Sequence, residues 1–299
     1  MMGAPAQPLF LGQGNAARFG IYHAPAAEQP CRGAFLYLAP FGEEMNKARR
    51  MAALQAAELA RLGFGVLQLD LHGCGDSAGD FGDASWDSWL ADVATGLQWL
   101  NAQLEAELPQ AAGLWGLRLG ALLALDYTHR ATAEPVSTLG SGSLVDTGLA
   151  VPGNLLLWQP VLQGSAHLTQ FLRLKVAAQM LGDEKAEGGT ASLRAALARG
   201  EPLEIAGYAL APALALGFDS LDASRLAPSC PVLWCEVVPE TGRPLPPAAA
   251  RVLKAWQDAG VAAEARTAAG PQFWATQEIA EAPALLAATC EALNEACHA

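Results

Sequence analysis

The chain has 299 residues, of which 52% are hydrophobic, so it can bury a large core, and its length is at the upper end for one α/β domain. Its formal net charge of -12 repels phosphate backbones and anionic headgroups, which argues against nucleic acid as a partner. The chain shows neither a basic segment followed by an apolar export-type run nor about 18 consecutive apolar residues. We therefore expect a cytoplasmic protein with no membrane insertion.

The cysteine and glycine spacings give no sign of a metal or a nucleotide cofactor. The six cysteines match neither a C-x-x-C redox pair nor paired zinc knuckles, and reduced structural thiols are expected. Gly73-Cys74-Gly75 lacks the third glycine of a dinucleotide-binding fingerprint, and the chain has no P-loop lysine. We expect no cofactor and no bound metal.

The first half of the chain alternates strand-length apolar runs with helical patterns, which is typical of a largely parallel sheet covered on both faces. An antiparallel pair turned at Gly12 would edge this sheet. Asn46 and Ser85 are expected helix N-caps, and Gly63 is an expected helix stop. Strands are expected at 8–11, 18–23, 33–39, 64–69 and 113–115, and helices at 47–62, 86–104 and 119–128.

The second half adds a long insertion to this pattern. Residues 130–153 are rich in small and turn-forming residues, which favours a surface loop. Residues 164–218 are mostly helical in pattern, with a polar glycine break at 182–190, and we interpret them as a lid over the carboxyl edge of the sheet. The remaining strands are expected at 154–158, 232–238 and 262–267, and the remaining helices at 247–259 and 279–296. The prediction is a doubly wound α/β core, 1–163 and 219–299, with a helical lid at 164–218.

One short stretch has the outline of a nucleophile elbow, G-x-Nu-x-G. It reads Gly116-Leu117-Arg118-Leu119-Gly120, between an apolar strand and an apolar helix. The two glycines give the strand and the helix room to approach, and the central residue then stands out above the sheet in a strained backbone conformation. That residue is an arginine, at the positive end of the following helix.

Three stretches resemble loops of the α/β-hydrolase superfamily, and the resemblance covers nearly the whole chain. APFGEEMNKARRM is similar to the family's oxyanion loop, DLHGCGDSAGDF to its D-x-x-G-x-G-x-S-x-G loop, and GLWGLRLGALLA to its elbow. Together with LLLWQPVLQG and GPQFWATQE, they look most like the second type of exosortase-A-system-associated hydrolases. The resemblance implies the α/β-hydrolase fold and a setting in bacteria that build exopolysaccharide and sort proteins to the envelope.

The resemblance also implies a triad in the chain order nucleophile, acid, histidine, and this sequence departs from it twice. Arg118 cannot be deprotonated and so cannot attack a carbonyl. After the last expected strand, where the family's histidine would stand, the chain carries Gln272, whose amide takes no proton at neutral pH. The acid position alone could survive, in Glu236 or Glu240. The histidines are His23, His72, His129, His167 and His298, of which only His298 follows the penultimate strand.

Arg118 needs a partner, because an unpaired buried cation is costly. One interpretation is an ion pair with an acid at the same edge, namely Glu43, Glu44, Glu236 or Glu240. The other is that its guanidinium, the helix end and the amides of Phe41 and Leu119 receive an anionic group of a ligand, and the two can coexist. The side chains of Glu43 and Glu44 should diverge. The expected ligand-binding residues are Phe41, Gly42, Glu43, Arg118, Leu119, Gln159 and Gln272.

The glycine-rich loop offers a second candidate nucleophile, Cys74, two residues after His72. A structural thiol is the favoured interpretation, since that loop packs beside the site in the superfamily. Asp76 and Ser77 are expected to make local hydrogen bonds.

Two functions follow from these residues. In the first, the protein has given up serine hydrolysis and binds a small anionic, acyl- or sugar-derived ligand in an exosortase or exopolysaccharide context. In the second, it hydrolyses an ester or thioester with water guided by Glu43 or Glu44. A purely structural or partner-binding role is a third alternative, and the sequence leaves a homodimer open.

Overall fold

An eight-stranded sheet forms the centre of the molecule in the computed structural model, which describes residues 6–104, 111–133, 149–181 and 188–296. The strands lie in the order β1-β2-β4-β3-β5-β6-β9-β10. The pairs β1–β2 and β2–β4 are antiparallel, and all later pairs are parallel. The strands are β1 (Gln7–Leu11), β2 (Arg18–His23), β3 (Gly33–Leu38), β4 (Phe64–Leu69), β5 (Gly113–Leu117), β6 (Leu155–Trp158), β9 (Val232–Val238) and β10 (Ala263–Ala269).

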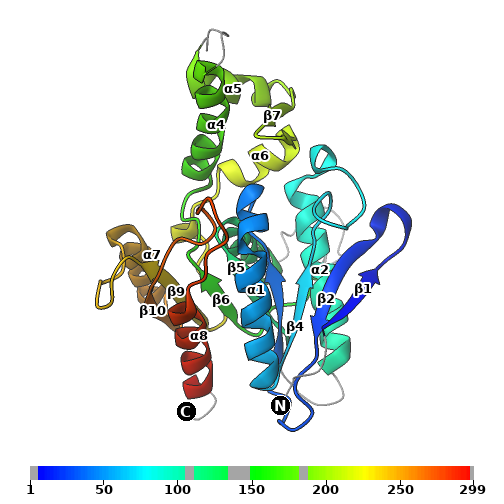
Figure 1. Cartoon of the computed structure of the whole chain (residues 1–299), viewed down its shortest axis with the longest axis vertical. Coiled ribbons are helices and arrows are strands. Elements are labelled where there is room, and N and C mark those ends of the chain that lie inside the picture. The colour runs from blue at the N-terminus through cyan, green and yellow to red at the C-terminus, as the bar shows by residue number, and fades with distance from the viewer. Residues whose placement is uncertain (1–5, 105–110, 134–148, 182–187, 297–299) are drawn as a thin grey trace, which may run out of the picture.

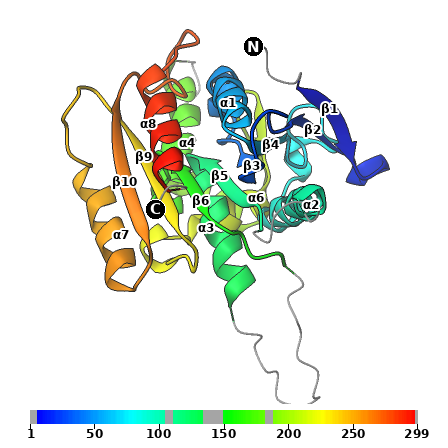
Figure 2. The same cartoon turned by 90° about the horizontal axis from the view of Figure 1, so that it is seen from below.

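Helices cover both faces of this sheet, as Figure 2 shows from below. Helices α1 and α8 lie on one face, whereas α2, α3 and α7 lie on the other. Ser85 caps α2, because its hydroxyl accepts a hydrogen bond from the backbone N–H of Ser88 at 3.0 Å. The helices are α1 (Glu43–Arg61), α2 (Trp86–Leu104), α3 (Leu119–Thr132), α7 (Pro247–Asp258) and α8 (Pro283–Ala296).

The sheet separates two hydrophobic cores because successive side chains on a strand point to opposite faces. On β6, Leu156 and Trp158 belong to the core on the α1 and α8 face, whereas Leu155 and Leu157 belong to the core on the α2, α3 and α7 face. Both faces are buried, so the inner strands read as continuous apolar runs rather than as alternating patterns. The expected α/β-hydrolase-type sheet, largely parallel and doubly wound, is confirmed.

The segment 164–219, called the insertion below, leaves the sheet after β6 and returns before β9. It contains α4 (Gly164–Leu181), α5 (Gly189–Ala198), a hairpin of β7 (Leu203–Ile205) and β8 (Tyr208–Leu210), and α6 (Pro212–Asp219). Figure 1 places these elements together above the ends of the central strands, at the opposite end of the molecule from the two chain termini. The hairpin was not expected from the sequence, because each of its strands has only three residues.

Most element boundaries agree with the sequence prediction, with one correction that bears on the site. Helix α1 begins at Glu43, not at Lys47, so Asn46 is not its N-cap. The residue before the helix is Gly42 with φ 56°, a conformation that glycine adopts without steric cost and that turns the chain sharply into the helix. Helix α3 also continues to Thr132, into the expected loop 130–153. Most of that loop, the break at 182–187 and His298 lie outside the described residues.

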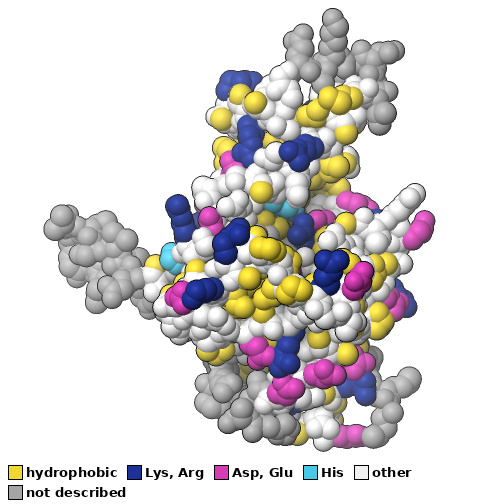
Figure 3. Space-filling model, turned by 90° about the vertical axis from the view of Figure 1, so that its left-hand side faces the viewer, with side chains coloured by type: hydrophobic (Ala, Val, Ile, Leu, Met, Phe, Trp, Pro, Cys, Tyr) yellow, Lys and Arg dark blue, Asp and Glu magenta, His cyan; other side chains and the backbone are white. Residues whose placement is uncertain are grey.

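The face seen in Figure 3 carries charges of both signs, and the described helices include no candidate membrane span. No helix among the described residues is long and apolar enough to cross a bilayer. On the face seen in Figure 3, acidic and basic side chains are interspersed, and a histidine and a basic side chain are visible in a recess where the upper part of the molecule meets the body.

Candidate functional site

The turn between β5 and α3 has the expected elbow geometry. Arg118 stands at its tip with φ 56° and ψ −116°, a backbone conformation that residues other than glycine rarely adopt. The flanking glycines make this turn possible. A Cβ on Gly120 would lie 2.1 Å from the carbonyl oxygen of Leu38, and one on Gly116 would lie 2.4 Å from the Cα of Ala121. Strand and helix therefore pack so closely that the strained residue between them projects above the sheet.

Of the acids expected near Arg118, Glu44 is the one that pairs with its guanidinium. Arg118 Nη2 donates to Glu44 Oε1 at 3.2 Å, and Nε lies 3.3 and 3.4 Å from the two carboxylate oxygens. The Arg118 guanidinium also lies over the Trp274 ring, 5.5 Å from its centroid. Burial raises the pKa of Glu44, and Arg118 opposes that rise. Because α1 begins four residues earlier than expected, Glu44 is in its first turn and reaches the elbow.

Glu43 and Glu240 do not reach Arg118. The Glu43 carboxylate accepts a hydrogen bond from Tyr208 Oη at 3.1 Å and lies 3.9 Å from Lys47 Nζ. The expected divergence of Glu43 and Glu44 is thus present. Glu240 is exposed and pairs with Arg243 at 4.0 Å.

A pocket of about 600 Å³ opens beside the elbow, between the insertion, the β9 end and α7. Arg118, Gln159 and Glu236 line it from the sheet side, His167 lines it from α4, and Arg251 lines it from α7. Such a pocket at the carboxyl ends of parallel strands is where α/β proteins usually bind ligands. This pocket is the candidate site.

Glu236 is the buried acid of this pocket. Its side chain lies on β9, and the residue is 5% exposed. Burial raises the pKa of this carboxyl to about 7, although the charge of Arg118 acts in the opposite direction. The indole of Trp234 approaches on the same side of the strand and also lowers that pKa, but without hydrogen-bond geometry. Glu236 Oε2 consequently has no hydrogen-bond partner among the described residues.

His167 is a site residue that the sequence reasoning missed. It lies in the first turn of α4, is 7% exposed, and packs edge-on against Phe41 and Phe218, with centroids 5.8 and 6.1 Å away. Both ring nitrogens are buried and lack a hydrogen-bond partner in the described part of the chain. Burial and the charge of Arg118 lower its pKa to about 3, so the ring is neutral. The family pattern places the histidine base after the last strand, and no local sequence signal marks His167.

Of the other expected ligand-binding residues, some line the pocket and others do not. Gln159 lines the pocket at φ 43°, and its Oε1 accepts the backbone N–H of Val237 at 2.8 Å, which ties β6 to β9. The side chains of Phe41 and Leu119 are buried in the core, which leaves only their backbone groups for a ligand. Gln272 is exposed and is not part of the pocket lining.

The glycine-rich loop after β4 is a structural support rather than part of the pocket. Ser77 accepts the backbone N–H of Phe19 and donates to the carbonyl of Asp70, and the backbone N–H of Asp76 reaches the Asp70 carboxylate. The expected local hydrogen bonds of this loop are confirmed. Burial raises the pKa of Cys74 to about 12, so it stays a thiol and is a poor nucleophile.

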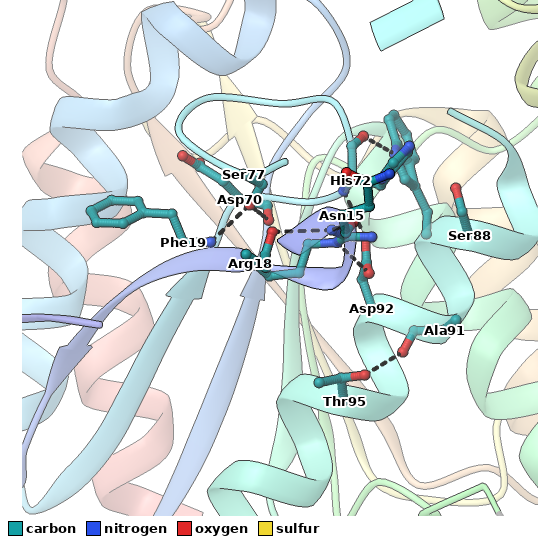
Figure 4. A network of polar contacts seen from close by, with 12 residues as sticks. Asn15, Arg18, Phe19, Asp70, His72, Ser77, Ser88, Ala91, Asp92 and Thr95 are labelled. Carbon is teal, nitrogen blue, oxygen red and sulfur yellow. Dashed lines mark hydrogen bonds and ion pairs between the residues drawn. The ribbon is translucent and has the colours of Figure 1, made fainter. Parts of the chain in front are cut away.

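A buried ion pair anchors the same loop to α2. Arg18 Nε donates to Asp92 Oδ1 at 2.6 Å, and the backbone N–H of His72 donates to Asp92 Oδ2 at 2.6 Å. Figure 4 shows Arg18, His72 and Asp92 converging from β2, the loop and α2. The network therefore fixes the glycine-rich loop against β2 and α2.

The described residues offer no group of three or more His, Cys, Asp or Glu side chains arranged to hold a metal ion. The described cysteines, Cys31, Cys74, Cys230, Cys235 and Cys290, are free thiols.

Comparison with known proteins supports the fold alone. No family model matches the chain, and no curated protein matches it in sequence. Among solved structures it is similar to Est1E from Butyrivibrio proteoclasticus with bound ferulic acid, with 13% identity, 94% of each chain covered and a TM-score of 0.62. It is also similar to a soluble variant of monoglyceride lipase from Saccharomyces cerevisiae, with 12% identity, 99% of this chain and 97% of that chain covered and a TM-score of 0.63.

A third similar structure is the thioesterase domain from the curacin biosynthetic pathway, with 14% identity, 97% of this chain and 100% of that domain covered and a TM-score of 0.52. These neighbours have the same central architecture as the present chain. Fold does not by itself imply function, so the chemistry must be argued from the elbow and its pocket.

Proposed function

We propose that this protein, which has the α/β-hydrolase fold, has given up serine hydrolysis and binds a small anionic ligand, acyl- or sugar-derived, in the pocket beside Arg118. One observation carries the proposal: a permanently charged guanidinium occupies the elbow tip and lines the pocket. A triad at this place needs a nucleophile and a histidine base. The elbow supplies Arg118, and residues 270–282 after β10 contain no histidine.

The remaining polar groups support binding rather than attack. Arginine cannot be deprotonated in a protein, so it cannot form an acyl intermediate. The guanidinium is instead suited to a carboxylate or phosphate, which it can bind through two parallel hydrogen bonds. Glu44 uses Nε and Nη2 of Arg118, and Nη1 has no acceptor among the described side chains and carbonyls.

The proposed setting is the cytoplasm of bacteria with an exosortase or exopolysaccharide system. Its support is the likeness of the oxyanion-loop, glycine-loop and elbow stretches to exosortase-associated hydrolases.

The test combines an activity screen with ligand binding. We expect no turnover of p-nitrophenyl esters or thioesters and no labelling by a fluorophosphonate probe. We expect a panel of small carboxylates and phosphates to contain a ligand that raises Tm by roughly 5 °C at about 100 times its Kd, because binding to the folded state alone stabilises it by about 2.7 kcal/mol. The Arg118→Met, Glu44→Gln double variant removes the guanidinium without leaving the Glu44 carboxylate unpaired, and it should abolish the shift.

The matched control is Arg199→Ala, which removes an exposed arginine of the insertion that pairs with Glu201. It should leave the thermal shift unchanged. The alternative of a carboxylate-assisted hydrolase would be supported by turnover that disappears in Glu43→Gln or Glu44→Gln. A trapped acyl adduct on the folded protein would refute the proposal.

A further inference from the structure

Several buried polar atoms at the pocket beside the elbow have no hydrogen-bond partner among the described residues. Glu236 Oε2 and both ring nitrogens of His167 are buried without a hydrogen-bond partner among the described residues. In folded proteins the large majority of buried polar atoms are paired, so unpaired atoms that gather at one cavity need an explanation. All of these atoms belong to side chains that line the same pocket.

These atoms require a partner that both donates and accepts hydrogen bonds. The neutral His167 ring carries one N–H donor and one acceptor nitrogen. The Glu236 carboxylate accepts when ionised and can donate when protonated, and its pKa near 7 makes both forms available. A hydroxyl group can meet each of these needs, whereas an alkyl chain can meet none.

The rest of the lining is also polar. Gln163, Gln170 and Ser224 contribute amides and a hydroxyl, and about half of the lining residues are polar or charged. Two guanidiniums line the cavity: Arg118 at the elbow and the exposed Arg251 of α7, which has no ion-pair partner among the described residues. The lining therefore offers cationic groups for one acid group and buried, unpaired polar atoms for hydroxyl groups.

We infer that the ligand is a polyhydroxylated carboxylate of the sugar-acid class, whose hydroxyls pair with His167 and Glu236 while its carboxylate meets the arginines. This inference rests on the proposed function and decides between the acyl- and sugar-derived ligands that it leaves open. A fatty acyl group would leave the buried polar atoms unpaired, and a site built to hydrogen-bond a hydroxyl discriminates strongly against an analogue that lacks it.

The test compares two six-carbon carboxylates on the whole protein. D-Glucuronate carries hydroxyls and hexanoate does not, and isothermal titration calorimetry measures both. We expect glucuronate to bind at least about tenfold more tightly than hexanoate. His167→Phe keeps a ring against Phe41 and Phe218 but removes both nitrogens, and Glu236→Leu removes the carboxyl. Each should weaken glucuronate binding about tenfold or more and leave hexanoate binding unchanged.

The control variant His129→Phe replaces an exposed histidine at the end of α3 and should bind as the parent does. Equal, Arg118-dependent binding of glucuronate and hexanoate would overturn the sugar-acid inference and leave the proposed function standing. Glucuronate binding that survives both pocket variants would also overturn it. If neither acid binds while another anion gives an Arg118-dependent thermal shift, the sugar-acid inference alone fails. If no anion binds, the proposed function fails with it.

Discussion

At the scale of single residues, the site consists of charges held in places where they are costly. Arg118 occupies a strained turn, and Glu44 offsets the cost of its burial. Glu236 receives only partial compensation, since Trp234 and Arg118 lower its pKa less than burial raises it. A protein retains such groups when function needs them, because packing alone would favour apolar residues at these positions.

Replacing Glu236 with glutamine should stabilise the protein, increasingly so as the pH rises. The Glu236 carboxyl has a pKa of about 7 in the folded protein, whereas a glutamate in the unfolded chain has the ordinary value of 4.5. Between these values the folded state binds the extra proton, so the stability of the parent falls with rising pH by up to about 3 kcal/mol. Arg118 and Trp234 face this carboxyl and oppose the shift.

Urea unfolding of the parent and of Glu236→Gln at pH 4.5, 6 and 8 measures this effect. The difference should be near zero at pH 4.5, present at pH 6 and largest at pH 8, with no further growth above it. A difference that is independent of pH would show that Glu236 does not titrate near neutrality.

At the scale of elements, long-range polar contacts fix the glycine-rich loop after β4. Arg18 of β2 and Asp92 of α2 are 74 residues apart in the chain, and Asp92 also accepts the backbone N–H of His72 in the glycine-rich loop. Both side chains are buried, so each partner depends on the other for compensation of its charge.

Removing one member of this pair should be strongly destabilising. Asp92→Ala leaves the Arg18 guanidinium buried and also removes the acceptor of the His72 N–H, which should cost about 3–5 kcal/mol of unfolding free energy. Chemical denaturation at pH 7 provides the measurement. Asp87→Ala, on the same helix with its side chain 87% exposed, is the control and should change stability by less than about 0.5 kcal/mol. Equal losses in the two variants would contradict this account.

At the scale of the whole molecule, an aromatic cluster joins the insertion to the body. The Phe41 ring lies 4.7 Å from Phe171 and 5.8 Å from Phe218 of the insertion, and 5.6 Å from Phe81 of the body. Phe41 is 3% exposed. Moving the insertion away from the sheet would break these ring contacts. We therefore expect the cluster to hold the pocket between the two parts in one shape.

Phe41→Ala should uncouple the insertion from the body. Truncating a buried phenylalanine costs about 3–5 kcal/mol, and this cost falls on the contact between the two parts. Hydrogen exchange should show the amides of α4 and α6 losing protection while the central strands keep theirs. Phe10→Ala, at a residue that is 61% exposed, should leave the exchange pattern unchanged. Uniform loss of protection in Phe41→Ala would mean that the insertion has no separate opening.

The sequence by itself determined the sheet, the elbow and the arginine at its tip. Strands such as β4 and β9 follow from buried apolar runs, and Gly116 and Gly120 mark the elbow because only glycine fits where strand and helix touch. Glu236 was recognisable as one of two candidate acids at the end of a late strand, the other being Glu240.

Only the tertiary structure decided which groups meet Arg118. Glu44 is 74 residues away in sequence, and its reach depends on where α1 begins, a boundary that Gly42 sets and that the Asn46 cap signal obscured. His167 joins the pocket because the insertion folds back over the sheet, and no local pattern records that contact. Local sequence fixes backbone conformation and burial, whereas pairing between distant polar side chains depends on how the packed elements are brought together.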